Sequence, residues 1–136
     1  MNRVFADTFY WVALIHRKDA SNGAVLEFSR TLGSAVLVTT DEVLTEVLAF
    51  CSSDQSLRRE AVITVRGILA ARNVRVIPQS HASFLDGLAL YEDRPDKGYS
   101  LADCISMQIM HREGLTDVLS NDRHFEQEGF RALFRS

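Results

Sequence analysis

The sequence alternates between short apolar runs and longer segments whose apolar residues recur at the spacing of a helix. The short runs predict β-strands over residues 3–6, 35–38, 74–77 and 117–120, with a last strand over 130–134. The longer segments predict helices over residues 9–17, 20–32, 41–50, 55–71, 80–91, 100–112 and 124–128. Strands that alternate with helices pair in parallel through right-handed crossovers. The sequence therefore predicts an α/β fold, a three-layer α/β/α sandwich with a central, mainly parallel sheet.

The chain has the length and apolar content of one ordinary domain, and we expect a single domain over residues 1–136. No apolar run reaches the roughly 18 residues that a membrane-spanning helix needs. Asp7 interrupts the N-terminal apolar segment, which argues against a secretory signal. Cys51 and Cys104 are isolated thiols whose spacing matches neither a disulfide framework nor a zinc site. These features predict a cytoplasmic protein that does not associate with membranes.

Four acidic residues lie where a ligand site of such a fold is expected. Asp7 and Asp122 each lie just beyond a predicted strand. Asp103 lies in the first turn of a predicted helix, and Glu46 lies one to two turns into another. Ligands of open α/β sheets bind outside the carboxyl ends of the strands, so these side chains are predicted to meet in one crevice. Because carboxylates bind Mg²⁺ or Mn²⁺ and such ions support phosphodiester hydrolysis, the four acids are the candidate catalytic residues and metal ligands.

Each of these acids also has an ordinary structural use. Asp7 and Asp122 can cap the helices that follow them. The segment from Ser100 to Asp103 resembles a capping box, and Glu46 can be a solvated helix residue. Against this, two carboxylates about 4 Å apart repel each other by roughly 4 kcal/mol at an effective dielectric constant of about 20. A metal-free cluster would destabilise the fold or take up protons, which favours a metal site over independent caps.

Other polar residues stand beside these acids in the sequence. The neighbouring hydroxyl residues are Thr8, Ser100 and Ser120. Each can hold a carboxylate in place or position a metal-bound water, and helix capping is the ordinary alternative. His124 lies two residues beyond Asp122 and is the histidine that merits a test as a neighbour of the site.

The charge balance permits a nucleic acid substrate without predicting one. The net charge of −3 and the pI of about 5.8 argue against a broad basic face. With the four acids of the predicted crevice set aside, the rest of the chain is close to neutral. Arg94 and Lys97 lie in the loop before Asp103, at the predicted edge of the crevice, where we expect them to contact phosphate groups.

Four segments carry a pattern that extends beyond the acids themselves. They are residues 4–8, 40–46, 96–104 and 119–125, and their order and spacing span essentially the whole chain. Together they resemble the PIN-domain ribonucleases, and in particular the VapC-type toxins of bacterial toxin–antitoxin pairs. The resemblance implies a PIN-like α/β/α nuclease fold, a requirement for Mg²⁺ or Mn²⁺, and endonucleolytic cleavage of RNA. It implies metal-binding roles for Asp7, Glu46, Asp103 and Asp122.

One residue departs from the family pattern. Phe9 stands where the family often has a small polar residue after the Asp-Thr pair. This puts a minor polar contact beside the site in question and leaves the metal ligands in place.

The resemblance further implies the toxin of a type II pair, with a homodimer and a small cognate antitoxin as partners. Several apolar residues of the predicted helices between 20 and 71 exceed the needs of a small core: Leu26, Phe28, Val43, Leu48, Leu57 and Ile63. They can form a dimer face or an antitoxin groove, or they can be plain core residues. Two other functions stay open, a non-catalytic PIN-fold module that binds RNA or protein and a structure-specific DNA nuclease.

Overall fold

Across residues 2–135, which the computed structural model describes, five strands form one sheet. Met1 and Ser136, the ends of the predicted domain, lie outside the described residues. The sheet has the order β3-β2-β1-β4-β5, and every neighbouring pair is parallel. The strands are β1 (Arg3–Ala6), β2 (Val36–Thr40), β3 (Val74–Ile77), β4 (Asp117–Leu119) and β5 (Arg131–Ala132).

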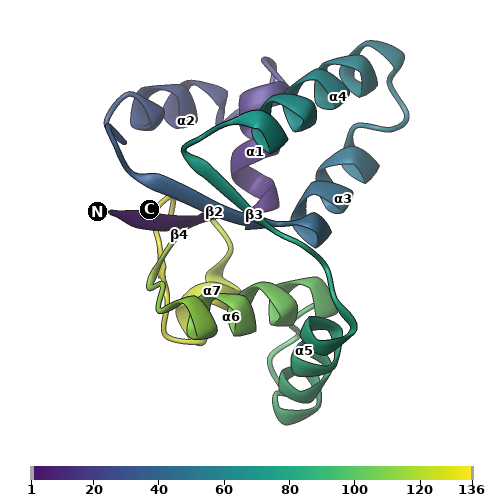
Figure 1. Cartoon of the computed structure of the whole chain (residues 1–136), viewed down its shortest axis with the longest axis vertical. Helices are drawn as coiled ribbons and strands as arrows, with labels where there is room; N and C mark the ends of the chain where they lie inside the picture. The colour runs from purple at the N-terminus through teal and green to yellow at the C-terminus, as the bar shows by residue number, and fades with distance from the viewer. Residues whose placement is uncertain (1, 136) are drawn as a thin grey trace.

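Helices cover both faces of this sheet (Figure 1). One face carries α1 (Thr8–Ile15), α2 (Asn22–Ser29), α3 (Asp41–Phe50) and α4 (Gln55–Ala70). The other face carries α5 (His81–Asp93), α6 (Leu101–Glu113) and α7 (Arg123–Gln127). The predicted three-layer α/β/α sandwich is therefore confirmed. Within residues 2–135, no helix combines the length and the apolar content that crossing a lipid bilayer requires.

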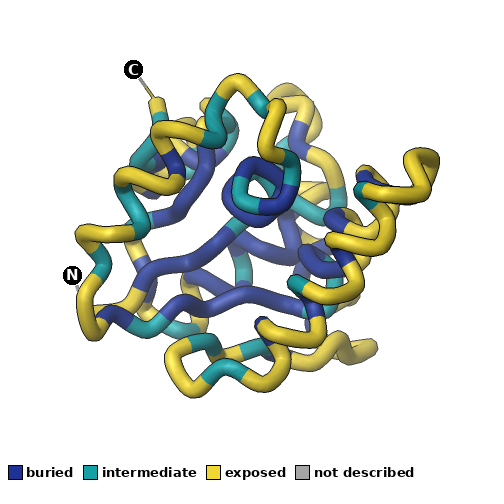
Figure 2. The backbone as a smooth tube through the Cα atoms, turned by 90° about the horizontal axis from the view of Figure 1, so that it is seen from above, coloured by how far each residue is buried: buried dark blue, intermediate teal, exposed yellow. Residues whose placement is uncertain are grey.

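The core lies on both sides of the central strand, which explains why the strands read as unbroken apolar runs. In β1, Val4, Phe5 and Ala6 are completely buried. A strand covered by helices on both faces has no solvent-facing positions, so polar residues do not alternate along it. Figure 2 shows the buried segments in the interior and the exposed ones along the outer helices and loops.

The element boundaries differ from the predicted ones mainly at helix ends. The predicted helix over 20–32 is shorter, because α2 ends at Ser29 and the backbone then forms i→i+3 turns. The N–H of Thr31 donates to the carbonyl of Phe28, and the N–H of Leu32 donates to that of Ser29. Helix α5 extends two residues past its predicted end to Asp93. The last predicted strand, over 130–134, is reduced to β5.

Helices α5 and α6 make a close contact at Gly87. This glycine is buried, and a Cβ atom built on it would overlap the side chain of Ile105. The same Cβ would lie 3.1 Å from the backbone nitrogen of Ile105 and 3.2 Å from its Cα. A glycine is needed here to let the two helix backbones approach, and the contact fixes the helix that carries Asp103.

Gly87→Ala is expected to lower the free energy of unfolding by about 1 to 3 kcal/mol, because α6 must shift to accept the added methyl group. Gly67→Ala in α4 is the matched control, since nothing lies within 4 Å of its Cβ position. This control is expected to gain about 0.5 to 1 kcal/mol from better helix propensity. Urea unfolding of both variants measures the difference, and equal stabilities would contradict the proposed contact.

Candidate active site

The site lies outside the carboxyl ends of β1 and β4, where the direction of strand order reverses. From β1 the chain proceeds through β2 to β3, and it then returns to the other side of β1 at β4. Such a reversal leaves a crevice between the two strand ends, which is where ligands of open α/β sheets bind. Asp7 follows β1, and Asp122 comes shortly after β4.

Ser120 joins these two strand ends. Its hydroxyl donates to Asp7 Oδ2 at 3.0 Å and accepts from the backbone N–H of Asp122 at 3.1 Å. Ser120 is completely buried, so its position is fixed by packing. Asp7 occupies the N-cap position of α1 but its carboxylate makes no capping hydrogen bond. The alternative that Asp7 serves only as a helix cap therefore has no support, and its carboxylate is bound by Ser120 instead.

Glu46 reaches the site from α3. The hydroxyl of Thr8, the residue after Asp7, donates to Glu46 Oε1 at 2.8 Å. This hydrogen bond ties the first turn of α1 to the middle of α3. Glu46 is exposed, whereas Asp7 is mostly shielded from solvent. The alternative that Glu46 is merely a solvated helix residue thus leaves out a specific contact with the residue next to Asp7.

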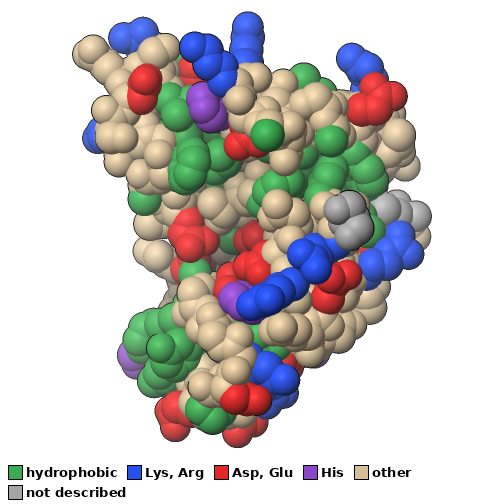
Figure 3. Space-filling model, turned by 180° about the vertical axis from the view of Figure 1, so that it is seen from behind, with side chains coloured by type: hydrophobic (Ala, Val, Ile, Leu, Met, Phe, Trp, Pro, Cys, Tyr) green, Lys and Arg blue, Asp and Glu red, His purple; other side chains and the backbone are tan. Residues whose placement is uncertain are grey.

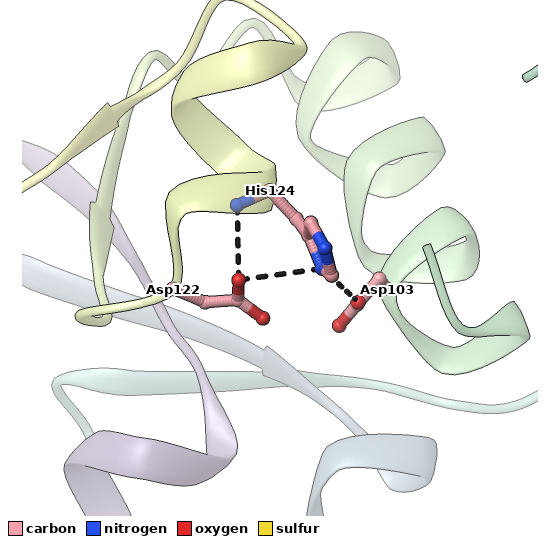
Figure 4. A group of neighbouring side chains, drawn as sticks. All are labelled: Asp103, Asp122 and His124. Atoms are coloured by element: carbon pink, nitrogen blue, oxygen red, sulfur yellow. Dashed lines mark hydrogen bonds and ion pairs between the residues drawn. The ribbon is translucent and has the colours of Figure 1, made fainter. Parts of the chain in front are cut away.

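Asp103 and Asp122 converge with His124 (Figure 4). Asp103 forms the predicted capping box with Ser100, since its Oδ2 accepts from the Ser100 N–H at 3.3 Å. Asp122 Oδ1 accepts from the His124 N–H at 2.9 Å, which is the predicted cap of α7. One ligand atom from each of the three side chains lies within 4.8 Å of the others. Capping and convergence coexist, because the caps hold these carboxylates at the crevice.

Burial and mutual repulsion raise the pKa values of two of these acids. Burial is the main cause for Asp7, and the charges of Asp103 and Glu46 add to it, so that its pKa rises to about 7. Burial also raises the pKa of Asp103, with the neighbouring Asp122 carboxylate as the next cause. Hydrogen bonds from Ser120 and from the Thr8 backbone oppose the rise at Asp7 without cancelling it.

No lysine or arginine within residues 2–135 forms an ion pair with any of the four acids. Among the ion pairs of residues 2–135, those of the four acids are made by His124, at 3.3 to 3.4 Å from two carboxylates. Figure 3 shows acidic side chains gathered in a recess of this face, with histidine and basic side chains at its border. Hard oxygen donors with no balancing side chain fit a divalent cation such as Mg²⁺ or Mn²⁺.

Arg94 is not placed to contact a phosphate as the sequence suggested. Its Nε and Nη2 atoms donate to the two carboxylate oxygens of Glu128, both at 2.9 Å. The hydroxyl of Tyr99 donates to Glu128 Oε1 at 3.1 Å. Lys97 makes a loose ion pair with Asp96 at 3.9 Å, which leaves it available for other contacts.

Tyr99 and Glu128 belong to the surroundings of the site, although the sequence did not point to them. The ring of Tyr99 packs against the ring of His124, with centroids 5.3 Å apart. Burial, followed by the contact with Glu128, raises the pKa of Tyr99 to about 12, so its hydroxyl stays a hydrogen-bond donor. Glu128 follows α7 and lies 29 residues from Tyr99 in the chain, a separation that carries no local sequence signal.

The fold is similar to that of two solved structures. VapC20 from Mycobacterium tuberculosis, described as a Sarcin-Ricin loop cleaving toxin, matches with a TM-score of 0.84 and 24% identity over 93% of this chain and 95% of that one. VapBC2 from Rickettsia felis, solved bound to a DNA fragment from its promoter, matches with a TM-score of 0.67 and 16% identity over 96% of each chain. At these identities the likeness shows a shared fold.

No curated protein sequence is similar enough to this chain to count as a match. The family comparison is nevertheless decisive, because the matched region runs from the first buried strand to the residue before β5 and includes all four acids. The PIN domain model matches residues 4–130, and the chain therefore belongs to the PIN domain family.

Proposed function

We propose that this protein is a divalent-metal-dependent endoribonuclease and the toxin of a type II toxin–antitoxin pair. The observation that supports the proposal is the closeness of Asp7, Glu46, Asp103 and Asp122, whose charges act on one another and which, within residues 2–135, pair with no lysine or arginine. A site of this kind raises the free energy of the metal-free protein, as the elevated pKa of Asp7 indicates. Its use is to hold a cation and a substrate phosphate.

The four acids would hold Mg²⁺ or Mn²⁺ through their carboxylate oxygens. When bound, such an ion supplies positive charge that polarises a phosphodiester and activates water. The protein's own contribution is to fix the carboxylates before RNA arrives. Ser120 holds Asp7 and the backbone of Asp122, and Thr8 holds Glu46. Such preorganisation keeps the reacting groups in line without reorganisation during the reaction.

RNA is the proposed substrate because the similar VapC20 is described as a toxin that cleaves the Sarcin-Ricin loop. The similarity to VapBC2, bound to promoter DNA, supports a cognate antitoxin as partner and a cytoplasmic location. A DNA nuclease and a non-catalytic binding module are the competing functions. The acid cluster argues against the second, because a purely structural role has no evident use for it.

Exposed apolar side chains support the proposed homodimer and antitoxin contacts. Of the residues singled out in the sequence, Leu26, Leu48 and Ile63 are exposed. Val43 is a core residue, which is the second of the two alternatives left open for it. The sequence did not point to several other large apolar residues of α3, α4 and α5 that are exposed in the structure. They are Phe50, Val62, Leu69, Phe84, Leu85 and Tyr91. A continuous apolar surface built from such residues would serve as a contact surface.

A digest of total RNA beside single-stranded DNA tests the proposed function. With Mn²⁺ or Mg²⁺ the protein is expected to cut RNA and to leave the DNA largely intact, and a chelator is expected to stop the reaction. Preferential cutting of DNA would favour the DNA nuclease. No cutting of either nucleic acid, with metal bound, would favour the non-catalytic module.

Arg94→Ala is expected to lower the free energy of unfolding, because it removes both guanidinium hydrogen bonds to Glu128 and leaves that carboxylate with the hydroxyl of Tyr99. It is expected to leave the salt dependence of RNA binding unchanged, since Glu128 already neutralises this guanidinium. Lys97→Ala is the contrasting variant. It is expected to reduce by about one the slope of the logarithm of the RNA-binding constant against the logarithm of the salt concentration. RNA binding measured over a series of KCl concentrations, with a second substitution that prevents cleavage, distinguishes the two variants. A reduced slope for Arg94→Ala would support the phosphate contact that the sequence suggested for Arg94.

A further inference from the structure

The ring of His124 stands between the carboxylates of Asp103 and Asp122. Its Nδ1 atom lies 3.4 Å from Asp103 Oδ2 and 3.3 Å from Asp122 Oδ1, and the three side chains point toward one another (Figure 4). Both separations exceed the usual N–H···O range of about 2.7 to 3.2 Å. Two ligands at right angles on an ion with bonds of about 2.1 Å lie about 3.0 Å apart. Nδ1 thus makes one long hydrogen bond, to Asp103, and its separations from both acids also suit three ligands that close around one ion.

The surroundings hold the ring in this orientation. The ring of Tyr99 packs against the ring of His124, and the hydroxyl of Tyr99 donates to Glu128. Glu128 in turn accepts hydrogen bonds from two guanidinium nitrogens of Arg94. Gly98 lies next to Nε2, since a Cβ there would come within 4.0 Å of that atom. Packing of this kind between two rings restrains the orientation of the imidazole. The hydrogen bonds from Arg94 and Tyr99 to Glu128 thus help to hold the imidazole of His124 in place, in addition to stabilising the fold.

From this geometry we infer that His124 Nδ1 is a direct ligand of the ion held by Asp103 and Asp122, and that it makes the site prefer Mn²⁺ to Mg²⁺. The inference rests on the proposed function, because it assumes that the crevice holds a divalent cation. It goes beyond that function by adding a nitrogen donor to an otherwise all-oxygen site.

A nitrogen ligand changes which ion the site favours. Mg²⁺ is bound through oxygen atoms and keeps several of its waters. Carboxylates suit Mg²⁺ and Mn²⁺ alike, whereas imidazole suits the first-row transition metals, of which Mn²⁺ is the weakest binder. His124 therefore contributes to the binding of Mn²⁺ and contributes little to that of Mg²⁺.

Electron paramagnetic resonance of the Mn²⁺-loaded protein tests the inference without any substitution. Coupling of the Mn²⁺ electron spin to a directly bound nitrogen is expected, and it should change when the histidines carry nitrogen-15. Mn²⁺ that binds without nitrogen coupling would overturn the inference and leave the proposed metal site standing. A protein that binds no Mn²⁺ would overturn both.

A pair of variants gives the second measurement. His124→Asn is expected to weaken Mn²⁺ binding by about tenfold while Mg²⁺ binding, read by displacement of Mn²⁺, changes less than about twofold. His81→Asn is the matched control, because His81 is exposed and stacks on Phe84 at the start of α5. Equal losses of Mn²⁺ and Mg²⁺ affinity in His124→Asn would show that the histidine only shapes the site, and would overturn the inference.

Discussion

Asp7→Asn is expected to reduce RNA cleavage by about a thousandfold. The substitution removes one negative charge from the centre of the crevice and with it several kcal/mol of the stabilisation that a bound cation supplies in the transition state. Asparagine has the shape of aspartate, and its side-chain oxygen can still accept the hydrogen bond from Ser120. The loss should therefore report the charge and not a collapsed site.

The initial rate of cleavage of a defined RNA in Mn²⁺ measures this effect. Asp86→Asn is the matched control, because Asp86 is an exposed residue of α5 that lies outside the crevice. The control should cleave at the wild-type rate. Cleavage that survives in Asp7→Asn, or that continues in the wild type after a chelator has removed all divalent ions, would contradict the proposed function.

The sequence was sufficient to place two of the four acids. Asp7 and Asp122 follow strands whose apolar runs are easily recognised, and parallel strands end at the same edge of a sheet. Glu46 and Asp103 sit on helices, so their convergence depended on helix length and on which face each helix covers. The hydrogen bond between Thr8 and Glu46, which brings α3 to the crevice, spans 38 residues and has no local signal.

Arg94 also shows that contacts between residues far apart in the chain leave no local signal in the sequence. A basic residue in a loop before an acidic site suggests a phosphate contact, but the partner that binds it, Glu128, lies 34 residues away. The surface apolar residues were predicted only in part for a similar reason. Val43 and Leu48 are both apolar residues of α3, and the packing of that helix determines which one is buried.

Without metal, the protein is expected to become less stable as the pH rises from about 5 to about 8. The folded-state pKa of Asp7 is about 7, above its ordinary value of 3.8. Between these values the folded protein holds a proton that the unfolded chain has released, so the free energy of unfolding falls with rising pH. The raised pKa of Asp103 acts in the same direction. Allowing for partial exposure of Asp7, the loss between pH 5 and pH 8 amounts to about 1 to 3 kcal/mol.

Thermal melting of the metal-free protein measures this effect, which should appear as a melting temperature about 5 to 15 °C lower at pH 8 than at pH 5. The ion-paired Glu113 and Glu128 do not interfere, because their lowered pKa values keep both ionised throughout this range. Asp7→Asn should melt higher than the wild type at pH 8 and show a smaller dependence on pH, whereas Asp86→Asn should behave as the wild type.

Mn²⁺ should reverse the loss, because the bound cation favours the ionised carboxylates. At a concentration about 100 times the dissociation constant it should add about 2.7 kcal/mol at pH 8. The gain should be smaller at pH 5, where the ion must displace a proton from Asp7, and it should be reduced in Asp7→Asn at both values. A metal-free protein that melts higher at pH 8 than at pH 5 would mean that the crevice carries no electrostatic penalty, and the argument for a metal site from its charge would fail.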